Sequence, residues 1–263
     1  MTAVWGIVNA TPDSFSDGGR YAEPGAALSH ARLLRAQGAA VLDVGGESTR
    51  PGAERVDPEE ERRRVLPVIE RLAADGLPLS IDTMNASTAV AAVHAGARIV
   101  NDVSGGLADP DMLSAVAESG ADVVLGHWRG PSADMYAQAE YSRIGREVAT
   151  ELGGRIAAAA AAGIAPSRVI VDPGIGFAKT AAQNWDLLRD LEDVVALGVR
   201  VLVGTSRKRF LTDALGEDAG EDRRDAATAV TSVLAARAGA WAVRVHDVAA
   251  TRDALAVLAA WDG

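Results

Sequence analysis

The sequence predicts an α/β protein in which eight parallel strands close into a barrel, with the active site at their carboxyl ends. The chain has 263 residues, close to the roughly 250 of a typical barrel of this kind. Short apolar segments rich in Val and Ile alternate with helix-like segments, as in a parallel sheet covered by helices. Eight such units without a linker-like break in composition favour a closed barrel over an open doubly wound sheet. Residues 1–263 are therefore predicted to form one (β/α)8 TIM-barrel domain.

The eight predicted strands are apolar runs, and most of them follow a turn that contains glycine, such as QGAA, DGLP or ESGAD. In order, they are residues 4–10, 39–46, 77–83, 97–104, 121–127, 168–174, 200–206 and 241–247. Near-continuous apolar character indicates strands buried on both faces. We therefore expect the helices to lie outside the strands.

The segments between the strands carry helix start and stop signals. After the second strand, Pro58 is followed by a run of acidic residues, and Gly76 closes the segment. This order is typical of a helix that begins with proline and ends at glycine. The alanine run of residues 157–162 is also predicted to be helical and is closed by Gly163 and Pro166.

Each predicted strand ends in a polar residue. These residues are Asn9, Asp43, Asp82, Asn101, His127, Asp172, Ser206, and Arg244 with His246. Any one of them is as easily explained as a turn former or a helix cap. In a barrel, however, all the carboxyl ends of the strands meet on one face. Carboxylates, carboxamides and strong cations on that face predict a site for a hydrogen-bonding ring that also carries an anion.

Composition narrows the classes of function. The 36 acidic residues outnumber the 26 basic ones and give a formal net charge of −10, which argues against a nucleic acid held by charge. The chain has no cysteine, which excludes disulfides, thiolate catalysis and cysteine-bound metals. Residues 4–10 are too short for a signal peptide or a membrane span. We expect a soluble cytoplasmic protein.

Seven sequence blocks, spread over essentially the whole chain, carry a family resemblance. They are NATPDSFSDGG (9–19), DVGGESTRPGA (43–53), SIDT (80–83), NDVSGG (101–106), DPGIGFAKT (172–180), GTSRK (204–208) and RVHDV (244–248). In this order they resemble the dihydropteroate synthases, the bacterial type of the pterin-binding family. DVGGESTRPGA and DPGIGF are specific signals, whereas SIDT alone is weak.

The resemblance implies a reaction and an assembly. Enzymes of this family join 6-hydroxymethyl-7,8-dihydropterin diphosphate to 4-aminobenzoate, forming 7,8-dihydropteroate and diphosphate in folate synthesis. They are barrels, usually homodimers, and use Mg²⁺. The partners expected here are therefore small-molecule substrates and a second copy of the chain, with no nucleic acid and no membrane.

The resemblance assigns the pterin to Asp172, Asp82, Asn101 and Lys208, together with the arginine of RVHDV. A carboxylate accepts the amidine-like donor pair of a pterin edge in bidentate fashion, and a carboxamide both donates and accepts. Lys208 is one of only two lysines in the chain, and a compact ammonium suits ring acceptors better than a guanidinium. The other, Lys179, is expected to be a supporting or surface residue that matters much less.

The diphosphate is assigned to Asn9, Arg244 and His246. Arg244 and His246 are two residues apart on the last predicted strand and therefore point to the same side. Asn9 is the implied Mg²⁺ ligand, and a single carboxamide is expected to hold the ion only together with diphosphate. The residues expected to act in catalysis are Asp17, Lys208 and Arg244, with Asp17 stabilising a cation in a dissociative substitution.

The second substrate is assigned to two loops and their surroundings. The 4-aminobenzoate residues implied by the resemblance are Phe15, Thr49, Arg50, Pro51, Phe177 and Ser206. The loops after the first two strands are rich in Gly, Ser and Asp, which favours irregular backbone. They are expected to close over the substrate and exclude water.

One residue departs from the family pattern. The family usually has a methionine where this chain has Gly126, and we expect the glycine to loosen the pterin pocket, with Trp128 in compensation.

Three alternatives remain open. The first is a paralogue that binds pterin without catalysis, and the second is a methyltetrahydrofolate-binding methyltransferase-type barrel. A Schiff-base aldolase that uses Lys208 is more remote.

Overall fold

The computed structural model describes residues 2–10, 24–47, 56–130 and 139–263. In this part of the chain, eight parallel strands form a closed barrel in which β1 pairs with both β2 and β8. The strands are β1 (Ala3–Asn9), β2 (Val41–Gly45), β3 (Leu79–Asp82), β4 (Ile99–Asp102), β5 (Asp122–Gly126), β6 (Val169–Asp172), β7 (Arg200–Val203) and β8 (Ala242–Val245). Each lies inside its predicted segment, except that β1 begins one residue earlier. The predicted barrel fold is confirmed.

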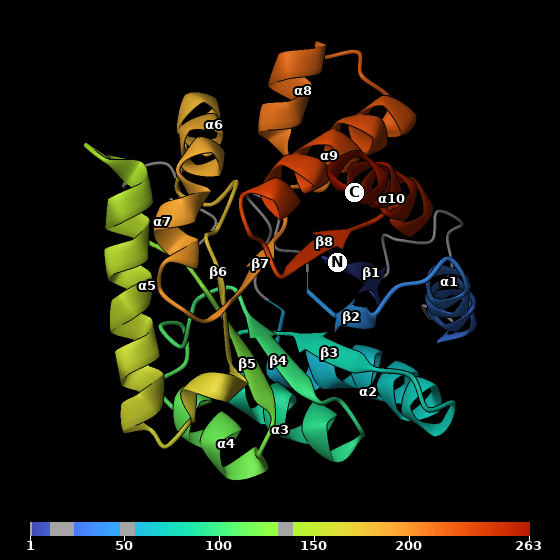
Figure 1. Ribbon diagram of the computed structural model, residues 1–263. Helices are drawn as coiled ribbons and strands as arrows, with labels where there is room; N and C mark the ends of the chain where they lie inside the picture. The colour runs from blue at the N-terminus through green and yellow to red at the C-terminus, as the bar shows by residue number, and fades with distance from the viewer. Residues whose placement is uncertain (1, 11–23, 48–55, 131–138) are drawn as a thin grey trace.

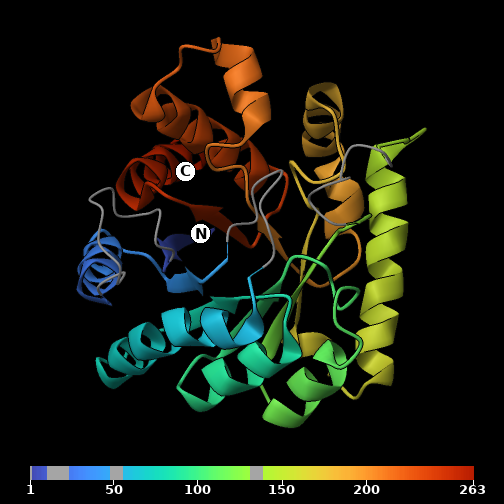
Figure 2. The ribbon, with the colours of Figure 1, turned by 180° about the vertical axis from the view of Figure 1, so that it is seen from behind.

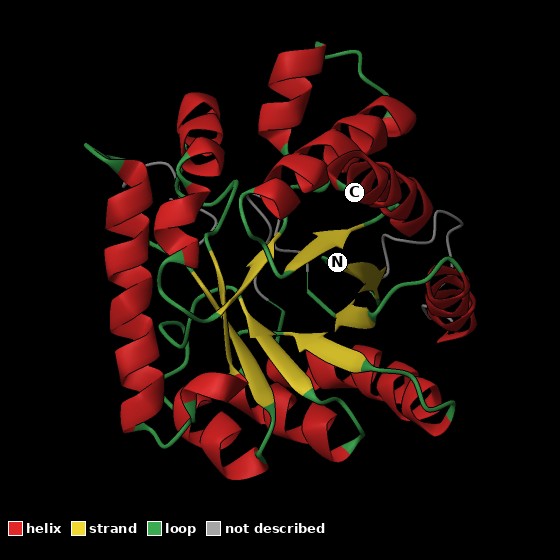
Figure 3. Ribbon diagram, in the orientation of Figure 1, coloured by secondary structure: helices red, strands yellow, loops and turns green. Residues whose placement is uncertain are grey.

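The helices lie outside the strands, as Figure 1 shows from one side and Figure 2 from behind. They are α1 (Pro24–Ala36), α2 (Pro58–Ala74), α3 (Ala86–His94), α4 (Met112–Ser119), α5 (Ile144–Ala161), α6 (Ala181–Arg189), α7 (Leu191–Val195), α8 (Arg209–Leu215), α9 (Glu221–Arg237) and α10 (Val248–Asp262), with a short 3-10 helix, η2 (Pro166–Arg168), before β6. The strands form the centre that these helices surround (Figure 3). Within the described ranges, no helix is both long enough and apolar enough to cross a membrane.

Local signals set the helix borders where the sequence predicts them. The carboxylate of Asp57 caps α2 by accepting a hydrogen bond from the backbone N–H of Glu59 at 2.8 Å, which satisfies a donor that has no partner inside the helix. Pro58 occupies the first turn, and Gly76 beyond the carboxyl end has φ 73°. The predicted alanine helix is the last part of α5.

The barrel interior is apolar on the amino-terminal side of the polar strand ends. Five inward-facing residues from five strands form one fully buried cluster: Trp5, Val124, Ile170, Leu202 and Ala242. The Trp5 ring meets Trp241 edge-on, with ring centroids 6.0 Å apart. Because alternate residues of a strand face the same side, Asp172 and Arg244, two residues further along β6 and β8, point into the same interior. The polar residues at the carboxyl ends of β6 and β8 therefore lie next to this apolar cluster along the barrel interior.

Strand register brings the polar ends together. In the pairing of β3, Asp82 lies opposite Gly45 on β2 and opposite Asn101 on β4. The outward residues of these strands, such as Leu42 and Ile81, are buried against the helices in the main core. A slip of one residue would exchange the two faces, so the buried outer face fixes the positions of the polar residues inside.

Candidate active site

Four polar residues from four strands make direct contacts at the carboxyl end of the barrel. Arg244 donates from Nε to Asp43 Oδ2 at 2.5 Å and from Nη2 to Asp82 Oδ2 at 2.7 Å. Asn101 donates from Nδ2 to the same Asp43 oxygen at 2.9 Å. Four of the nine polar strand-end residues named from the sequence thus form one hydrogen-bonded group, with Arg244 and Asp43 at its centre.

Asp43 is the member of this hydrogen-bonded group to which the sequence analysis gave no role. Its side chain is 0% exposed, and Oδ2 holds both Arg244 and Asn101. The other oxygen, Oδ1, is buried and has no hydrogen-bond partner among the described residues. The signal that could have identified it was its place at the end of a predicted strand, beside the specific GGESTRPG motif.

The buried carboxylates perturb one another. Burial raises the pKa of Asp82 to about 7, with Arg244 opposing the rise and Asp43 adding to it. Burial also raises the pKa of Asp172, against the opposing charge of Lys208. For Arg244, burial lowers the pKa, but Asp43 and Asp82 outweigh it and hold the pKa above its usual value. Arg244 is therefore a fixed cation between carboxylates, one of which titrates near neutrality.

Lys208 enters the site from the segment after β7. Its ammonium donates to the backbone carbonyl of Ile175 and lies 4.6 Å from the centroid of the Phe177 ring. Burial lowers the pKa of Lys208 to about 8, although Asp172 opposes the change. A Cβ at Gly176 would lie 2.8 Å from Lys208 Cδ, so glycine is needed there for the lysine to lie along the loop.

The two arginines that flank Lys208 point elsewhere. Arg207 forms a bidentate ion pair with Asp225 on α9, with both distances at 2.7 Å. The Arg209 side chain is 77% exposed and is a solvated charge. Of this basic triplet, only the lysine serves the candidate site.

Asp172, Lys208 and Arg244 border one space at the end of β7. A Cβ added at Gly204 would lie 3.8 Å from Asp172 Oδ2, 3.9 Å from Lys208 Nζ and 3.9 Å from Arg244 Cβ. On the opposite side, a Cβ at Gly45 would lie 3.6 Å from Asp82 Oδ2. Glycines at inward-facing positions thus leave room for a ligand between the polar groups.

Ser206 and His246 form a pair. The Ser206 hydroxyl lies 2.8 Å from His246 Nδ1 and accepts from the His246 backbone N–H at 3.0 Å. Ser206, assigned to the second substrate, therefore contacts a residue assigned to the diphosphate. The two predicted subsites meet at this hydrogen bond.

A metal ion would find few protein ligands here. Asn9 ends β1 opposite Gly45, and the described residues contain no group of three or more His, Cys, Asp or Glu side chains suited to hold a metal. Mg²⁺ prefers six oxygen ligands and often takes them from water and substrate phosphates. The residues present therefore fit Mg²⁺ only together with a phosphate ligand.

Five predicted site residues, Phe15, Asp17, Thr49, Arg50 and Pro51, lie outside the described residues.

The structure bears on two expectations about single residues. Lys179 is 1% exposed, so of the two alternatives for it, the surface position is wrong. The looser pocket expected at Gly126 stays a prediction, although a Cβ there would lie 2.3 Å from the Val103 carbonyl oxygen. Backbone of the β4–α4 connection already fills that space.

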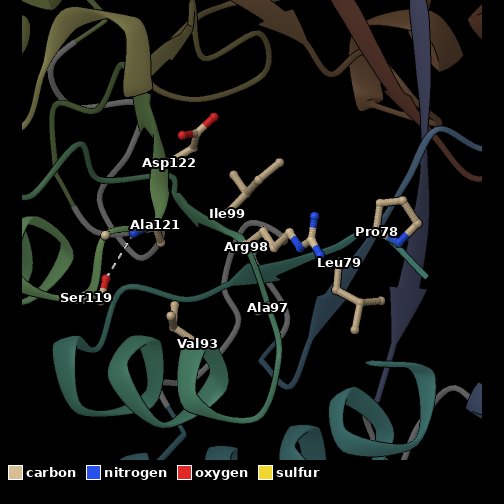
Figure 4. A pocket seen from close by; sticks show the side chains of 10 residues that line it. Pro78, Leu79, Val93, Ala97, Arg98, Ile99, Ser119, Ala121 and Asp122 are labelled. Carbon is tan, nitrogen blue, oxygen red and sulfur yellow. Dashed lines mark hydrogen bonds between the residues drawn. The ribbon is translucent and has the colours of Figure 1, made fainter. Parts of the chain in front are cut away.

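A cavity of about 510 Å³ lies at the other end of the strands (Figure 4). Among its lining residues, Leu79, Ile99 and Asp122 are the first residues of β3, β4 and β5. It is therefore separated from the polar carboxyl ends by the length of the barrel. We place the candidate active site at the carboxyl ends, where the interacting charged groups lie.

Comparisons with known proteins show what this chain is similar to. A model of the pterin binding enzyme family matches residues 5–246. The dihydropteroate synthase of Mycobacterium leprae is 52% identical over 98% of this chain and 93% of its own. A structure of Xanthomonas albilineans dihydropteroate synthase with 4-aminobenzoic acid has a TM-score of 0.93 at 48% identity, covering 100% of this chain and 93% of the other. The same enzyme in complex with 7,8-dihydropteroate has a TM-score of 0.89 at 45% identity, covering 100% and 94%.

Proposed function

The chain belongs to the dihydropteroate synthases of the pterin-binding enzyme family, and we propose that it performs their reaction by a dissociative substitution. The reaction condenses 6-hydroxymethyl-7,8-dihydropterin diphosphate with 4-aminobenzoate and releases diphosphate, a step of folate biosynthesis. The observation that carries the proposal is a group of contacts inside the barrel. Arg244 donates hydrogen bonds to Asp43 and Asp82, and Asn101 donates to the same oxygen of Asp43.

The pterin would lie in the space bordered by Asp172, Lys208 and Arg244. Asp172 offers carboxylate oxygens to the amidine-like edge of the ring, and Lys208 offers an ammonium to its acceptors. Asp82 and the unpartnered oxygen of Asp43 supply further acceptors. The mouth of the site is therefore complementary to a ring that is rich in N–H donors.

The charge balance favours a cationic intermediate. With its carboxyl groups ionised, the described site has two cations, Lys208 and Arg244, against three carboxylates, Asp43, Asp82 and Asp172. A field of this sign stabilises positive charge that develops on the pterin when the diphosphate departs. The aniline nitrogen is neutral at pH 7, so its lone pair is free to attack the cation after the diphosphate has left. The new C–N bond makes this nitrogen acidic, and it releases its extra proton to the departing diphosphate or to water.

The diphosphate then needs additional positive charge, because the carboxylates already neutralise Arg244. We propose that Mg²⁺ at Asn9 supplies it, with His246 donating a hydrogen bond. We propose that Asp17 helps to stabilise the cation. We also propose that 4-aminobenzoate binds beside Phe177 and Ser206, to the loops that carry Phe15, Thr49, Arg50 and Pro51.

The central test is incubation with the pterin diphosphate and 4-aminobenzoate, followed by mass analysis of the product. Formation of 7,8-dihydropteroate is expected. Pterin binding without product would instead support a non-catalytic paralogue, and methyl transfer would support the methyltransferase-type barrel. An adduct trapped by borohydride on Lys208 would support an aldolase.

The order of bond changes has its own measurement. A small carbon isotope effect at the reacting carbon is expected for a loose transition state. A large effect, characteristic of concerted displacement, would refute the dissociative order.

We also propose that the chain forms a homodimer through α9. An apolar groove of about 480 Å³ runs along α6, α8 and α9, and Val230 and Leu234 at its edge are 60% and 50% exposed. Sedimentation should show a dimer that Val230→Asp dissociates. The matched control is Leu33→Asp on α1, where an equally exposed leucine (54%) lies on another face; equal dissociation by both changes would refute this interface.

A further inference from the structure

Both lysines of the chain donate hydrogen bonds to the backbone of one loop, which connects β6 to α6 and itself carries Lys179. Lys179 Nζ donates to the backbone carbonyls of Gly174 at 3.0 Å and Phe177 at 2.9 Å. Lys208 Nζ donates to the carbonyl of Ile175, between them. The loop that carries Phe177 is therefore held from two sides by ammonium groups.

The loop adopts a conformation that needs such support. Gly174 has φ 68°, and a Cβ there would lie 2.3 Å from the carbonyl oxygen of His127. Ala178 also has a positive φ, 49°, which is rare for a residue other than glycine and persists only when the surroundings fix it. The hydrogen bonds from Lys179 supply part of that constraint.

The third N–H group of Lys179 is hydrogen-bonded to the imidazole of His127, which is in turn hydrogen-bonded to the carboxylate of Glu151. Lys179 Nζ lies 3.0 Å from His127 Nδ1, and His127 Nε2 lies 2.9 Å from Glu151 Oε2 on α5. An ammonium only donates and a carboxylate only accepts. His127 must therefore be neutral, with Nδ1 accepting from Lys179 and Nε2–H donating to Glu151.

The pKa values agree with this assignment. Burial lowers the pKa of Lys179 to about 7, and Asp172 opposes the change. Burial lowers the pKa of His127 to about 4, and the hydrogen bond from His127 lowers the pKa of Glu151 to about 2. Lys179 thus carries a buried charge whose retention depends on negative charge nearby.

We propose that Lys179 is a positioning residue for dihydropteroate synthesis: its ammonium fixes the backbone of the β6–α6 loop beside Lys208, and the hydrogen-bond chain through His127 to Glu151 holds the ammonium in place. The proposal rests on the proposed function. Its consequence for the site is direct, because the same loop donates the Gly174 N–H to Asp172 Oδ1 at 2.7 Å. The loop therefore couples the pterin carboxylate Asp172 to Phe177 and Lys208.

Loss of the proton would weaken the loop. A neutral amine has two N–H donors for the three acceptors of Lys179, so one of them loses its partner. The charged and titratable groups that surround Lys179 are Asp172 on β6, Lys208 after β7, His127 and Arg129 after β5, Glu151 on α5, and the Tyr141 ring at 5.8 Å. Of the carboxylates, Glu151 is the one that can be changed outside the pterin contacts.

Glu151→Gln is the decisive variant, and Glu147→Gln is its matched control. Glu147 lies one turn earlier on α5 and 3.6 Å from Arg129, and it accepts hydrogen bonds from the backbone N–H groups of Ser142 and Arg143. Without the Glu151 charge, Lys179 loses its proton at lower pH. The rise of KM for 4-aminobenzoate with increasing pH should therefore begin at a lower pH in Glu151→Gln than in the unmodified enzyme, and at an unchanged pH in Glu147→Gln.

Nitrogen-15 NMR of the unmodified protein tests the proposal without a variant. The chain has four histidines, and His127 should show the neutral Nε2–H tautomer, with Nδ1 as an acceptor. The opposite tautomer, or equal KM profiles for the two glutamine variants, would overturn the proposal. Failure of the unmodified enzyme to form 7,8-dihydropteroate would instead overturn the proposed function, so the two failures are distinguishable.

Discussion

Lys208→Ala should nearly abolish dihydropteroate formation and leave the fold intact. The change removes an ammonium that contacts the Ile175 carbonyl and lies against the Phe177 ring. It also removes the charge that lowers the pKa of Asp172. In the variant, the pKa of Asp172 therefore rises further, and this carboxyl takes up its proton at a higher pH than in the unmodified enzyme. Once protonated, it no longer accepts both pterin donors.

The magnitude follows from these two losses. A buried hydrogen bond from a charged group, together with the acceptor left unpaired, is worth about 2–4 kcal/mol, or roughly 30- to 1,000-fold in kcat/KM. The Asp172 effect adds a pH dependence. Because its pKa rises in the variant, the remaining activity should be lowest at acidic pH and should recover in part as the pH increases.

The assay is kcat/KM as a function of pH, together with the melting temperature. Arg209→Ala is the control, because it removes a neighbouring positive charge whose side chain is 77% exposed. Activity of Lys208→Ala within threefold of the unmodified enzyme, at an unchanged melting temperature, would refute the reasoning. So would an acidic limb of the pH profile that does not move.

Three further predictions concern the metal, the cation and the packing of β5. Because Asn9 is the expected protein ligand, calorimetry should show weak Mg²⁺ binding to the free protein and tighter binding with diphosphate; equally tight binding in both cases would mean that a carboxylate site was missed. Asp17→Asn should lower kcat much more than pterin-diphosphate affinity, since its charge matters mainly as the cation forms; a loss confined to affinity would contradict this. Gly126→Ala should destabilise the fold by about 1–3 kcal/mol, because the new Cβ meets Val103 backbone at 2.3 Å. Chemical denaturation should show no such loss for Gly153→Ala on α5, where the nearest atom to an added Cβ is 3.9 Å away.

Much of the site could be located from the sequence, because the end of a buried strand is recognised by the change from apolar to polar residues. Asp82, Asn101 and Arg244 each follow an apolar run, and parallel strands in a closed barrel bring their carboxyl ends to one face. Their contact therefore followed from topology, without knowledge of any side-chain position. Asp43 met the same criterion, but its role as the shared partner of Arg244 and Asn101 could not be predicted. That role depends on the register of β2 with its neighbours and on the directions of the Arg244 and Asn101 side chains.

The sequence by itself determined the barrel, its strand order and the face that carries the polar groups, because these depend on hydrophobic periodicity and on turn residues, which are local. Only the tertiary structure decided that Lys179 is buried against His127, 52 residues away, and that Val103 backbone fills the space beside Gly126. Both depend on distances between segments that are remote in the chain. Close packing sets those distances to within fractions of an ångström, a precision that residue types and their spacing do not carry.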